Sequence, residues 1–154
     1  MTKRKTTTAT IATTATWRIH FFQRHRADDA AQAVPARDFL LRCPEKVRGM
    51  MLAVVKAVAD APPPTFSGGG KWEAMHGEMR GWYEVRVDGR DRHHFRLFCL
   101  LEKDGATLGL GGPSVVLVTG KDKPFQTVLS DADYAEVRRL GAEFRARAPR
   151  SVAP

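Results

Sequence analysis

Two short segments near the middle of the chain each place an arginine two residues after a side chain that can exchange protons. Arg86 follows Glu84 at this spacing, and Arg96 follows His94. Guanidinium groups hold phosphate oxygens through paired hydrogen bonds, whereas carboxylate and imidazole groups take or give protons. These residue types fit chemistry at a phosphodiester, where cations must stabilise the charge that develops on phosphorus-bound oxygens.

Three lysines extend this set of candidate residues. Lys121 and Lys123 follow the apolar segment 114–119, and Lys71 opens a weaker strand-like segment. We predict that Lys121 and Lys123 lie in a loop at the end of a central strand, where functional residues are frequent. We therefore expect the cations of these segments to gather on one concave face.

The alternation of the two middle segments predicts which side chains share a face. Apolar residues at odd positions, such as Val85 and Leu97, should lie against covering helices. The charged residues at even positions then share the other face, with Arg86 opposite or diagonal to Arg96. We expect this face to be exposed and to lie away from the helices. Neighbouring arginines repel each other unless acids or an anionic ligand compensate. An ordinary solvated strand face and an anion-binding site both satisfy this pattern.

The order of apolar patterns along the chain predicts a single α+β domain. We expect an antiparallel sheet of about four or five strands, with an N-terminal helix pair on one face and a C-terminal helix. The expected strands are 17–22, 71–76, 81–87, 92–102 and 114–119, and the expected helices are 36–42, 44–60 and 130–147. Ser130 is the expected N-cap of the last helix, and Tyr134 is expected to face the core. We expect Cys43 and Cys99 to be buried thiols that form no disulfide.

The termini differ in composition from the rest of the chain. We expect a disordered, basic, threonine-rich tail over 1–16, a folded domain over 17–148 and a frayed end over 149–154. The net charge of +8 divides into +6 from residues 1–26, zero from 27–120 and +2 from 121–154. Total charge therefore says little about the folded part. The chain has no apolar run long enough for a membrane span and no secretory h-region, so we expect a cytoplasmic protein.

Several segments together resemble the RelE/HigB class of toxins from type II toxin–antitoxin systems, including its phage-derived HigB-like branch. Residues 81–86, Gly-Trp-Tyr-Glu-Val-Arg, resemble the family strand Gly-x-Tyr-Glu-Leu-Arg, and 94–98 are similar to the strand that follows it. Residues 115–125 resemble that branch's apolar strand and lysine-rich loop. The resemblance extends over about 17–144, while the leader, the glycines 68–70 and the insertion 104–113 depart from compact members of the family.

The resemblance implies ribosome-dependent cleavage of messenger RNA and neutralisation by an antitoxin, here expected to be of the helix-turn-helix type and to form a hetero-oligomer with the toxin. Such cleavage requires a base for the ribose 2′-hydroxyl, an acid for the leaving 5′-oxygen and cations for the phosphate, with no metal or other cofactor. The candidate catalytic residues are Arg86, Arg96, Lys121 and Lys123, and the candidate RNA-binding residues are Lys71, Glu84 and His94.

Some assignments stay open at the level of sequence. Glu84, His94 and Lys71 are all candidates for the general base, and Lys121 or Lys123 is a candidate for the acid. Two other functions also fit the same fold: a non-catalytic, phage-derived or domesticated binding protein, and a ParE-like inhibitor of gyrase. The arginine pair favours the ribonuclease over the gyrase inhibitor, because gyrase inhibition makes no demand for phosphate-stabilising arginines on that sheet face.

Overall fold

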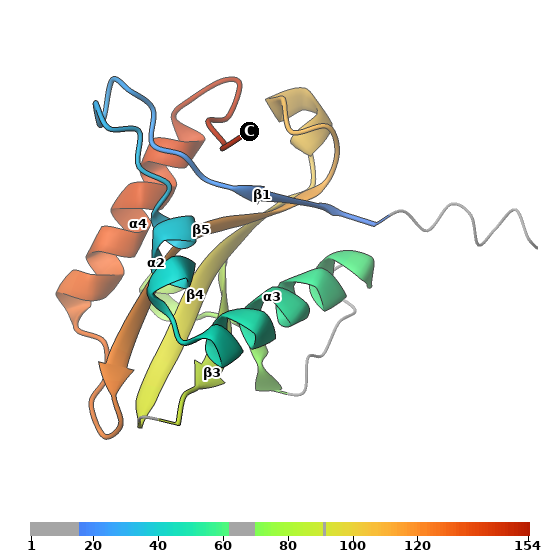
Figure 1. Ribbon diagram of the computed structural model, residues 1–154. Helices are drawn as coiled ribbons and strands as arrows, with labels where there is room; N and C mark the ends of the chain where they lie inside the picture. Colours follow the sequence, from blue (N-terminus) through green and yellow to red (C-terminus); the bar gives the residue numbers. More distant parts are fainter. Residues whose placement is uncertain (1–15, 62–69, 91) are drawn as a thin grey trace, which may run out of the picture.

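A computed structural model describes residues 16–61, 70–90 and 92–154 of the chain (Figure 1). Apart from Thr16, the expected N-terminal tail lies outside the described residues. The same is true of the glycine-rich connector, apart from Gly70.

The described residues form a five-stranded sheet and three α-helices. The sheet has the strand order β1-β5-β4-β3-β2. In chain order the elements are β1 (Arg18–Phe21), α2 (Pro35–Arg42), α3 (Glu45–Asp60), β2 (Trp72–Ala74), β3 (Trp82–Asp88), β4 (His93–Glu102), β5 (Ser114–Pro124) and α4 (Asp131–Arg145). The expected α+β class and the expected order of elements are confirmed. No helix among the described residues is long and apolar enough to cross a membrane.

The sheet is mixed, so the prediction of a wholly antiparallel sheet is wrong for one strand. Strands β2 to β5 form an antiparallel meander, whereas β1 runs parallel to β5, with Arg18 opposite Ser114. The connection between β1 and β2 passes through both α2 and α3, and a helical connection of this length can return the chain in either direction. Side-chain alternation identifies the faces of β1 but carries no information about the direction of its neighbour.

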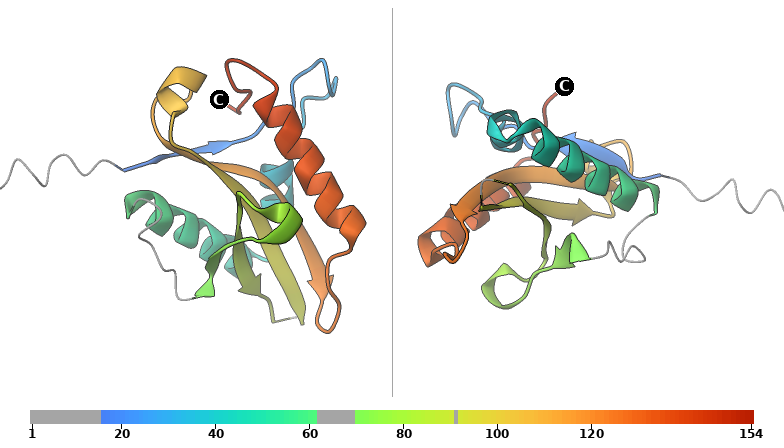
Figure 2. Two further views of the ribbon diagram at one scale, coloured as in Figure 1. Left: turned by 180° about the vertical axis from the view of Figure 1, so that it is seen from behind. Right: turned by 60° about the horizontal axis from the view of Figure 1, so that its bottom comes forward.

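The two faces of the sheet are covered by different helices (Figure 2). On one face, α2 and α3 bury the odd-numbered residues of β3 and β4, such as Val85 and Leu97. On the other face, α4 buries Phe98 and Leu100 of β4. Strand β5 has buried apolar residues on both faces, as its continuous apolar sequence predicts for a strand inside a sheet.

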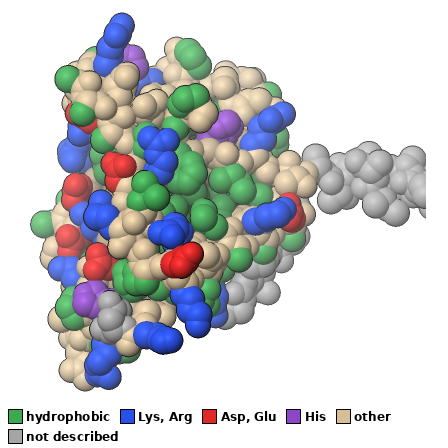
Figure 3. Space-filling model, viewed as in Figure 1, with side chains coloured by type: hydrophobic (Ala, Val, Ile, Leu, Met, Phe, Trp, Pro, Cys, Tyr) green, Lys and Arg blue, Asp and Glu red, His purple; other side chains and the backbone are tan. Residues whose placement is uncertain are grey.

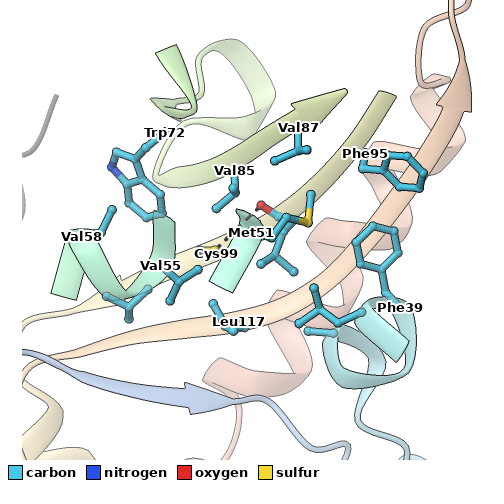
Figure 4. Packing of buried hydrophobic residues seen from close by; sticks show 14 of the residues in the cluster. Phe39, Met51, Val55, Val58, Trp72, Val85, Val87, Phe95, Cys99 and Leu117 are labelled. Atoms are coloured by element: carbon cyan, nitrogen blue, oxygen red, sulfur yellow. Dashed lines mark hydrogen bonds between the residues drawn. The ribbon is translucent and has the colours of Figure 1, made fainter. Parts of the chain in front are cut away.

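Helix α3 is attached to the sheet by one apolar stripe. Met51, Val55 and Val58 are buried and lie one turn apart, which is the spacing of a helix that buries a single face. Figure 4 shows them directed toward Val85 and Leu117 of the sheet. Complete burial of an aliphatic side chain contributes about 1.5–3 kcal/mol, so this stripe accounts for much of the attachment of the helix.

Both cysteines are buried thiols, as expected, and lie on different parts of the chain. Cys99 lies within β4, and Cys43 lies between α2 and α3. Burial raises the pKa of the Cys43 thiol to about 11 and also raises that of Cys99. Neither thiol is therefore activated as a nucleophile at neutral pH.

The C-terminal end contacts the domain, which corrects the expectation that residues 149–154 are frayed. Val152 forms an antiparallel bridge with Phe22, just beyond β1, and the amide of Ala153 donates to the carbonyl of Phe21. The hydroxyl of Ser151 donates to the carbonyl of Gln23 at 2.6 Å. These bonds satisfy backbone groups at the free edge of β1. Pro149 and Pro154, which led to the expectation of a frayed end, do not prevent this contact.

Two helical glycines allow the packing of the helices to be tested. Gly141 of α4 is buried, and a Cβ there would lie 2.3 Å from the Trp82 ring, whereas a Cβ at exposed Gly49 of α3 would meet nothing within 4 Å. Alanine favours a helix over glycine by about 1 kcal/mol. We expect Gly49→Ala to raise the free energy of unfolding by up to about 1 kcal/mol, and Gly141→Ala to lower it by about 1 kcal/mol or more because of overpacking. Urea denaturation measures both; stabilisation by Gly141→Ala would contradict the packing of α4 on Trp82.

Candidate functional site

The register of β3 and β4 brings the two candidate arginines together. Arg86 lies directly opposite Arg96, and Asp88 lies directly opposite His94. Glu84 is two residues before Arg86 and shares its face. This confirms the predicted alternation, in which the charged residues of both strands point away from α2 and α3.

Lys121 and Lys123 lie on a strand and not in a loop, which corrects the sequence-based expectation. Strand β5 continues to Pro124, with Lys121 opposite Arg96 and Lys123 opposite His94. Directly opposite residues of neighbouring strands have their Cβ atoms about 5 Å apart. Arg86, Arg96 and Lys121 therefore form a line of cations across three adjacent strands, which we call the cation row.

Lys71 lies at the β3 end of the cation row. Strand β2 begins at Trp72, which is paired with Val85, and the amide of Arg86 donates to the carbonyl of Lys71 at 2.9 Å. Lys71 is therefore the next residue in line beyond Arg86. The candidate cations, scattered over 53 positions from 71 to 123, are brought to one region of the sheet.

The face that carries the cation row is partly covered, whereas we expected it to be exposed and away from helices. The N-terminal part of α4 and the segment before it lie over this face and leave a pocket of about 280 Å³. Only 13% of the Arg96 side chain is exposed. The pocket is lined by Glu84, Arg86, His94, Arg96, Lys123, Thr127, Val128, Leu129 and Tyr134, and we call it the first pocket.

Acidic side chains compensate the two arginines. Arg86 contacts Glu84 at 3.1 Å and Glu73 at 3.5 Å. Arg96 is 3.9 Å from Glu84 and 3.7 Å from Asp88, and it donates to the carbonyl of its neighbour Phe95 at 3.0 Å. The carboxylates near Arg96 are therefore beyond hydrogen-bonding distance, which leaves donors of this guanidinium without a short acidic partner among the described contacts.

The environment of Arg96 opposes its positive charge. Burial lowers the pKa of its guanidinium, and the nearby charge of Arg86 lowers it further, while Glu84 and Asp88 act in the opposite direction. Arginine nevertheless stays protonated in proteins. Arg96 is thus a buried cation whose neighbours compensate it incompletely, and an anion in the first pocket would gain from its field.

Acids of α4 hold the two lysines. Lys123 is 3.4 Å from Asp133, and Lys121 is 3.9 Å from Asp133 and forms an ion pair with Glu136. Asp133 also completes a capping box with Ser130, the predicted N-cap residue of the helix. Its hydrogen bond from the Ser130 amide lowers the pKa of Asp133, and Lys123 lowers it further.

His94 and Asp88 form a close pair at the edge of the first pocket. The Nδ1 atom of His94 lies 2.7 Å from a carboxylate oxygen of Asp88, and this hydrogen bond lowers the pKa of Asp88. The imidazole also lies against the Phe125 ring, with centroids 4.6 Å apart. When Nδ1 donates to Asp88, the other ring nitrogen is left as a proton acceptor, which is the arrangement a general base requires.

Tyr134 is a residue of the site that sequence reasoning assigned to the core. It lies in the first turn of α4, lines the first pocket and makes an edge contact with the Phe98 ring at 6.2 Å. Burial raises the pKa of its hydroxyl, followed by the nearby negative charge of Glu84. Its phenol therefore keeps its proton and remains a hydrogen-bond donor. The signal in the sequence was its position directly after Asp133, in the acidic first turn of α4.

The predicted site residues differ in how closely the structure brings them together. The first pocket contains Glu84, Arg86, His94, Arg96 and Lys123, whereas Lys121 lies in the cation row outside its lining and Lys71 lies at the other end. No group of three or more histidine, cysteine or acidic side chains among the described residues is arranged to hold a metal ion. The first pocket combines partly buried cations, a histidine–aspartate pair and a protonated phenol.

Comparisons with known proteins leave the family of this chain undetermined. The chain matches no protein-family model, no curated protein and no solved structure.

The capping box of α4 predicts a specific dependence of stability on pH. We expect Asp133→Ala to lower the free energy of unfolding by about 1 kcal/mol, the usual contribution of a cap. Because folding lowers the pKa of Asp133, this contribution is present above the pKa of the unfolded chain, about 3.9, and is lost as the pH falls through the lower folded value.

The control is Asp131→Ala, since Asp131 is exposed in the same helical turn but is not part of the capping box. Chemical denaturation between pH 7 and pH 3 should show the stability gap of Asp133→Ala closing in acid. A gap that stays constant, or an equal loss for Asp131→Ala, would refute the assignment.

Proposed function

We propose that this chain is a RelE/HigB-class toxin of a type II toxin–antitoxin system, a metal-independent endoribonuclease that cleaves messenger RNA on the ribosome. The observation that carries the proposal is the cation row, in which Arg86, Arg96 and Lys121 come from three adjacent strands and lie beside a pocket. The resemblance of the sequence segments supports the same conclusion independently. The cognate antitoxin, messenger RNA and the ribosome are the proposed partners.

The arginines are suited to stabilise the transition state of phosphodiester cleavage. Two guanidinium groups side by side offer a fixed set of donors to the equatorial oxygens of a phosphate, and the low exposure of Arg96 strengthens this interaction. Since these donors are in place before the substrate arrives, little reorganisation accompanies the reaction.

His94 is the best-supported general base. Its ring nitrogen opposite Asp88 would take the proton of the ribose 2′-hydroxyl as the 2′-oxygen forms its bond to phosphorus. The bond to the 5′-oxygen then breaks, and this oxygen receives a proton from an acid. The products are a 2′,3′-cyclic phosphate and a 5′-hydroxyl, with one proton removed and one returned.

Lys123 is better supported than Lys121 as the acid. Lys123 lines the first pocket opposite His94, whereas Lys121 is engaged by Glu136. The protonated phenol of Tyr134 supplies a further donor to the phosphate. Glu84 is assigned a positioning role, because it contacts both arginines and is nearly buried.

One observation favours a second candidate function. Each cation of the row has acidic neighbours within 4 Å, so the network is compatible with a purely structural role. A non-catalytic, phage-derived or domesticated binding protein of the same fold would show this pattern without cleaving RNA. A ParE-like gyrase inhibitor also remains an alternative, although it has no use for the arginine pair.

Cleavage of messenger RNA on translating ribosomes tests the proposed function. We expect Arg96→Ala to lower the cleavage rate by about two to three orders of magnitude, as removal of one preorganised donor does. Arg86→Ala should act in the same direction. His94→Gln should slow cleavage, because it removes the proposed proton acceptor.

The matched control is Arg37→Ala, because Arg37 is exposed on α2, on the opposite side of the sheet. Circular dichroism would establish that each variant is folded. Cleavage at the wild-type rate by folded Arg86→Ala and Arg96→Ala would overturn the assignment of the site. Absence of cleavage by wild-type protein would favour the binding protein.

Induced expression provides a test in cells. Without an antitoxin, wild-type protein should arrest bacterial growth and deplete messenger RNA, while Arg96→Ala should permit growth at the same soluble level. Growth arrest with intact messenger RNA and damaged DNA would instead support gyrase inhibition. Normal growth with abundant soluble wild-type protein would contradict a toxin.

A further inference from the structure

A second pocket adjoins the first and shares both arginines with it. It has a volume of about 330 Å³, and its lining includes Gly70, Lys71, Arg86, Asp88 and Arg96. The first pocket extends from the arginines toward His94 and Lys123, whereas the second extends toward Lys71. The guanidinium groups of Arg86 and Arg96 thus stand between two adjoining hollows.

The short length of β2 explains why a hollow forms at this position. β2 is paired with β3 only as far as Trp72 opposite Val85, followed by the single bond from the Arg86 amide to the Lys71 carbonyl. Beyond that bond, β3 continues through Val87 and Asp88 with no strand of the described residues on its β2 side. The hollow therefore forms where the pairing of β2 ends, and its lining also includes Met50 of α3 and Val87.

Lys71 differs from the other cations of this region. Arg86, Arg96, Lys121 and Lys123 each contact acidic side chains, but no ion pair between described residues involves Lys71. In the second pocket, Lys71 and the two arginines face one carboxylate, that of Asp88. That carboxylate is also hydrogen-bonded to His94. The charged side chains that line this pocket, three cations and one carboxylate, therefore have a net positive charge.

We propose that the second pocket binds the phosphate adjacent to the one held in the first pocket, so that the ligand is a single-stranded polynucleotide with at least two consecutive phosphates. Arg86 and Arg96 lie between the two phosphates, and Lys71 holds the second one. The proposal rests on the proposed function for the identity of the ligand, but it concerns binding and does not require cleavage.

The recessed position of Arg96 selects a single strand over a duplex. With 13% of its side chain exposed, Arg96 meets a phosphate only if that phosphate enters one of the two pockets that it lines. The backbone of a single strand can bend to insert two phosphates in succession, whereas a stiff duplex keeps its phosphates on the surface of a cylinder.

The probe is a fluorescent octaribonucleotide with 2′-O-methyl groups throughout, which has phosphates but no 2′-hydroxyl to be deprotonated. Its dissociation constant is measured by anisotropy from 0.05 to 0.5 M salt for wild-type protein, Lys71→Ala and a control. Each lost phosphate contact on a single strand lowers the slope of log K against log salt by about 0.7. Lys71→Ala should therefore lower the slope by about 0.7 and weaken binding about fivefold at 0.1 M salt.

The matched control is Lys103→Ala, an exposed lysine beyond the far end of β4. It should leave the slope at the wild-type value, and a duplex of the same sequence should bind wild-type protein more weakly than the single strand. An unchanged slope for folded Lys71→Ala overturns the second pocket, as does equal loss in Lys103→Ala or absence of binding by wild-type protein. The cleavage assay on ribosomes is independent of this result, so Lys71→Ala with a wild-type slope and intact cleavage would remove the second pocket and leave the proposed function standing.

Discussion

The repulsion between two arginines that face each other across neighbouring strands must be compensated by the rest of this domain. Arg86 and Arg96 occupy directly opposite positions on β3 and β4. Like charges at this spacing destabilise a sheet, and the burial of Arg96 increases the cost. Glu84 compensates both guanidinium groups from within the same face, and its own side chain is only 10% exposed. The attraction between this carboxylate and the two cations offsets part of the free energy that their desolvation costs.

A bulge in β5 brings a further positive charge, from a third strand, beside the two arginines. Cys99 lies opposite Leu117, but Phe98 lies opposite Thr119, so Val118 is an extra residue on β5. A shift of one residue moves every later side chain to the other face. Without it, Lys121 would point toward α2 and α3, and with it Lys121 lies opposite Arg96. Gly120 then faces the Phe39 ring of α2, where a Cβ would lie 2.1 Å from that ring, so packing on one face maintains the register of the charges on the other.

The acidic N-terminus of α4 compensates the positive charge of the lysines that the bulge places on this face. Asp133 and Glu136 lie one turn apart and contact Lys121, while Asp133 also contacts Lys123. Acids in the first turn are favourable to the helix in any case, so the same residues stabilise α4 and the sheet surface beneath it. This double role explains why α4 crosses the charged face, with its apolar residues on Phe98 and Leu100 and its acidic end over the lysines (Figure 2).

The parts of the site that could be predicted from the sequence are those encoded by local alternation. The common face of Glu84, Arg86, His94 and Arg96 follows from the apolar residues between them, and the start of α4 follows from Ser130. The position of α4 could not be predicted, because an apolar stripe identifies which side of a helix is buried but not which face of a sheet receives it. Tyr134 was therefore assigned to the core, and the arginines to an open surface. The bulge at Val118 could not be predicted either, because the apolar residues before it fit both registers equally well.

The distances between the basic groups and their neighbouring carboxylates indicate where an anion would bind most favourably. The lysines of β5 are close to carboxylates of α4, and an anion would have to displace those carboxylates to bind there. Around Arg96 the acidic oxygens stand at 3.7 and 3.9 Å, so a phosphate could accept hydrogen bonds from this guanidinium without breaking a short one. Figure 3 views the molecule from the opposite side, that of α2 and α3, where basic and acidic side chains lie around an apolar area. Arg96 and Arg86 both line the first pocket and the second pocket. A phosphate is therefore bound most favourably at the point where the two pockets meet. A polynucleotide that places one phosphate on each side of Arg96 makes the fullest use of the remaining hydrogen-bond donors of this guanidinium.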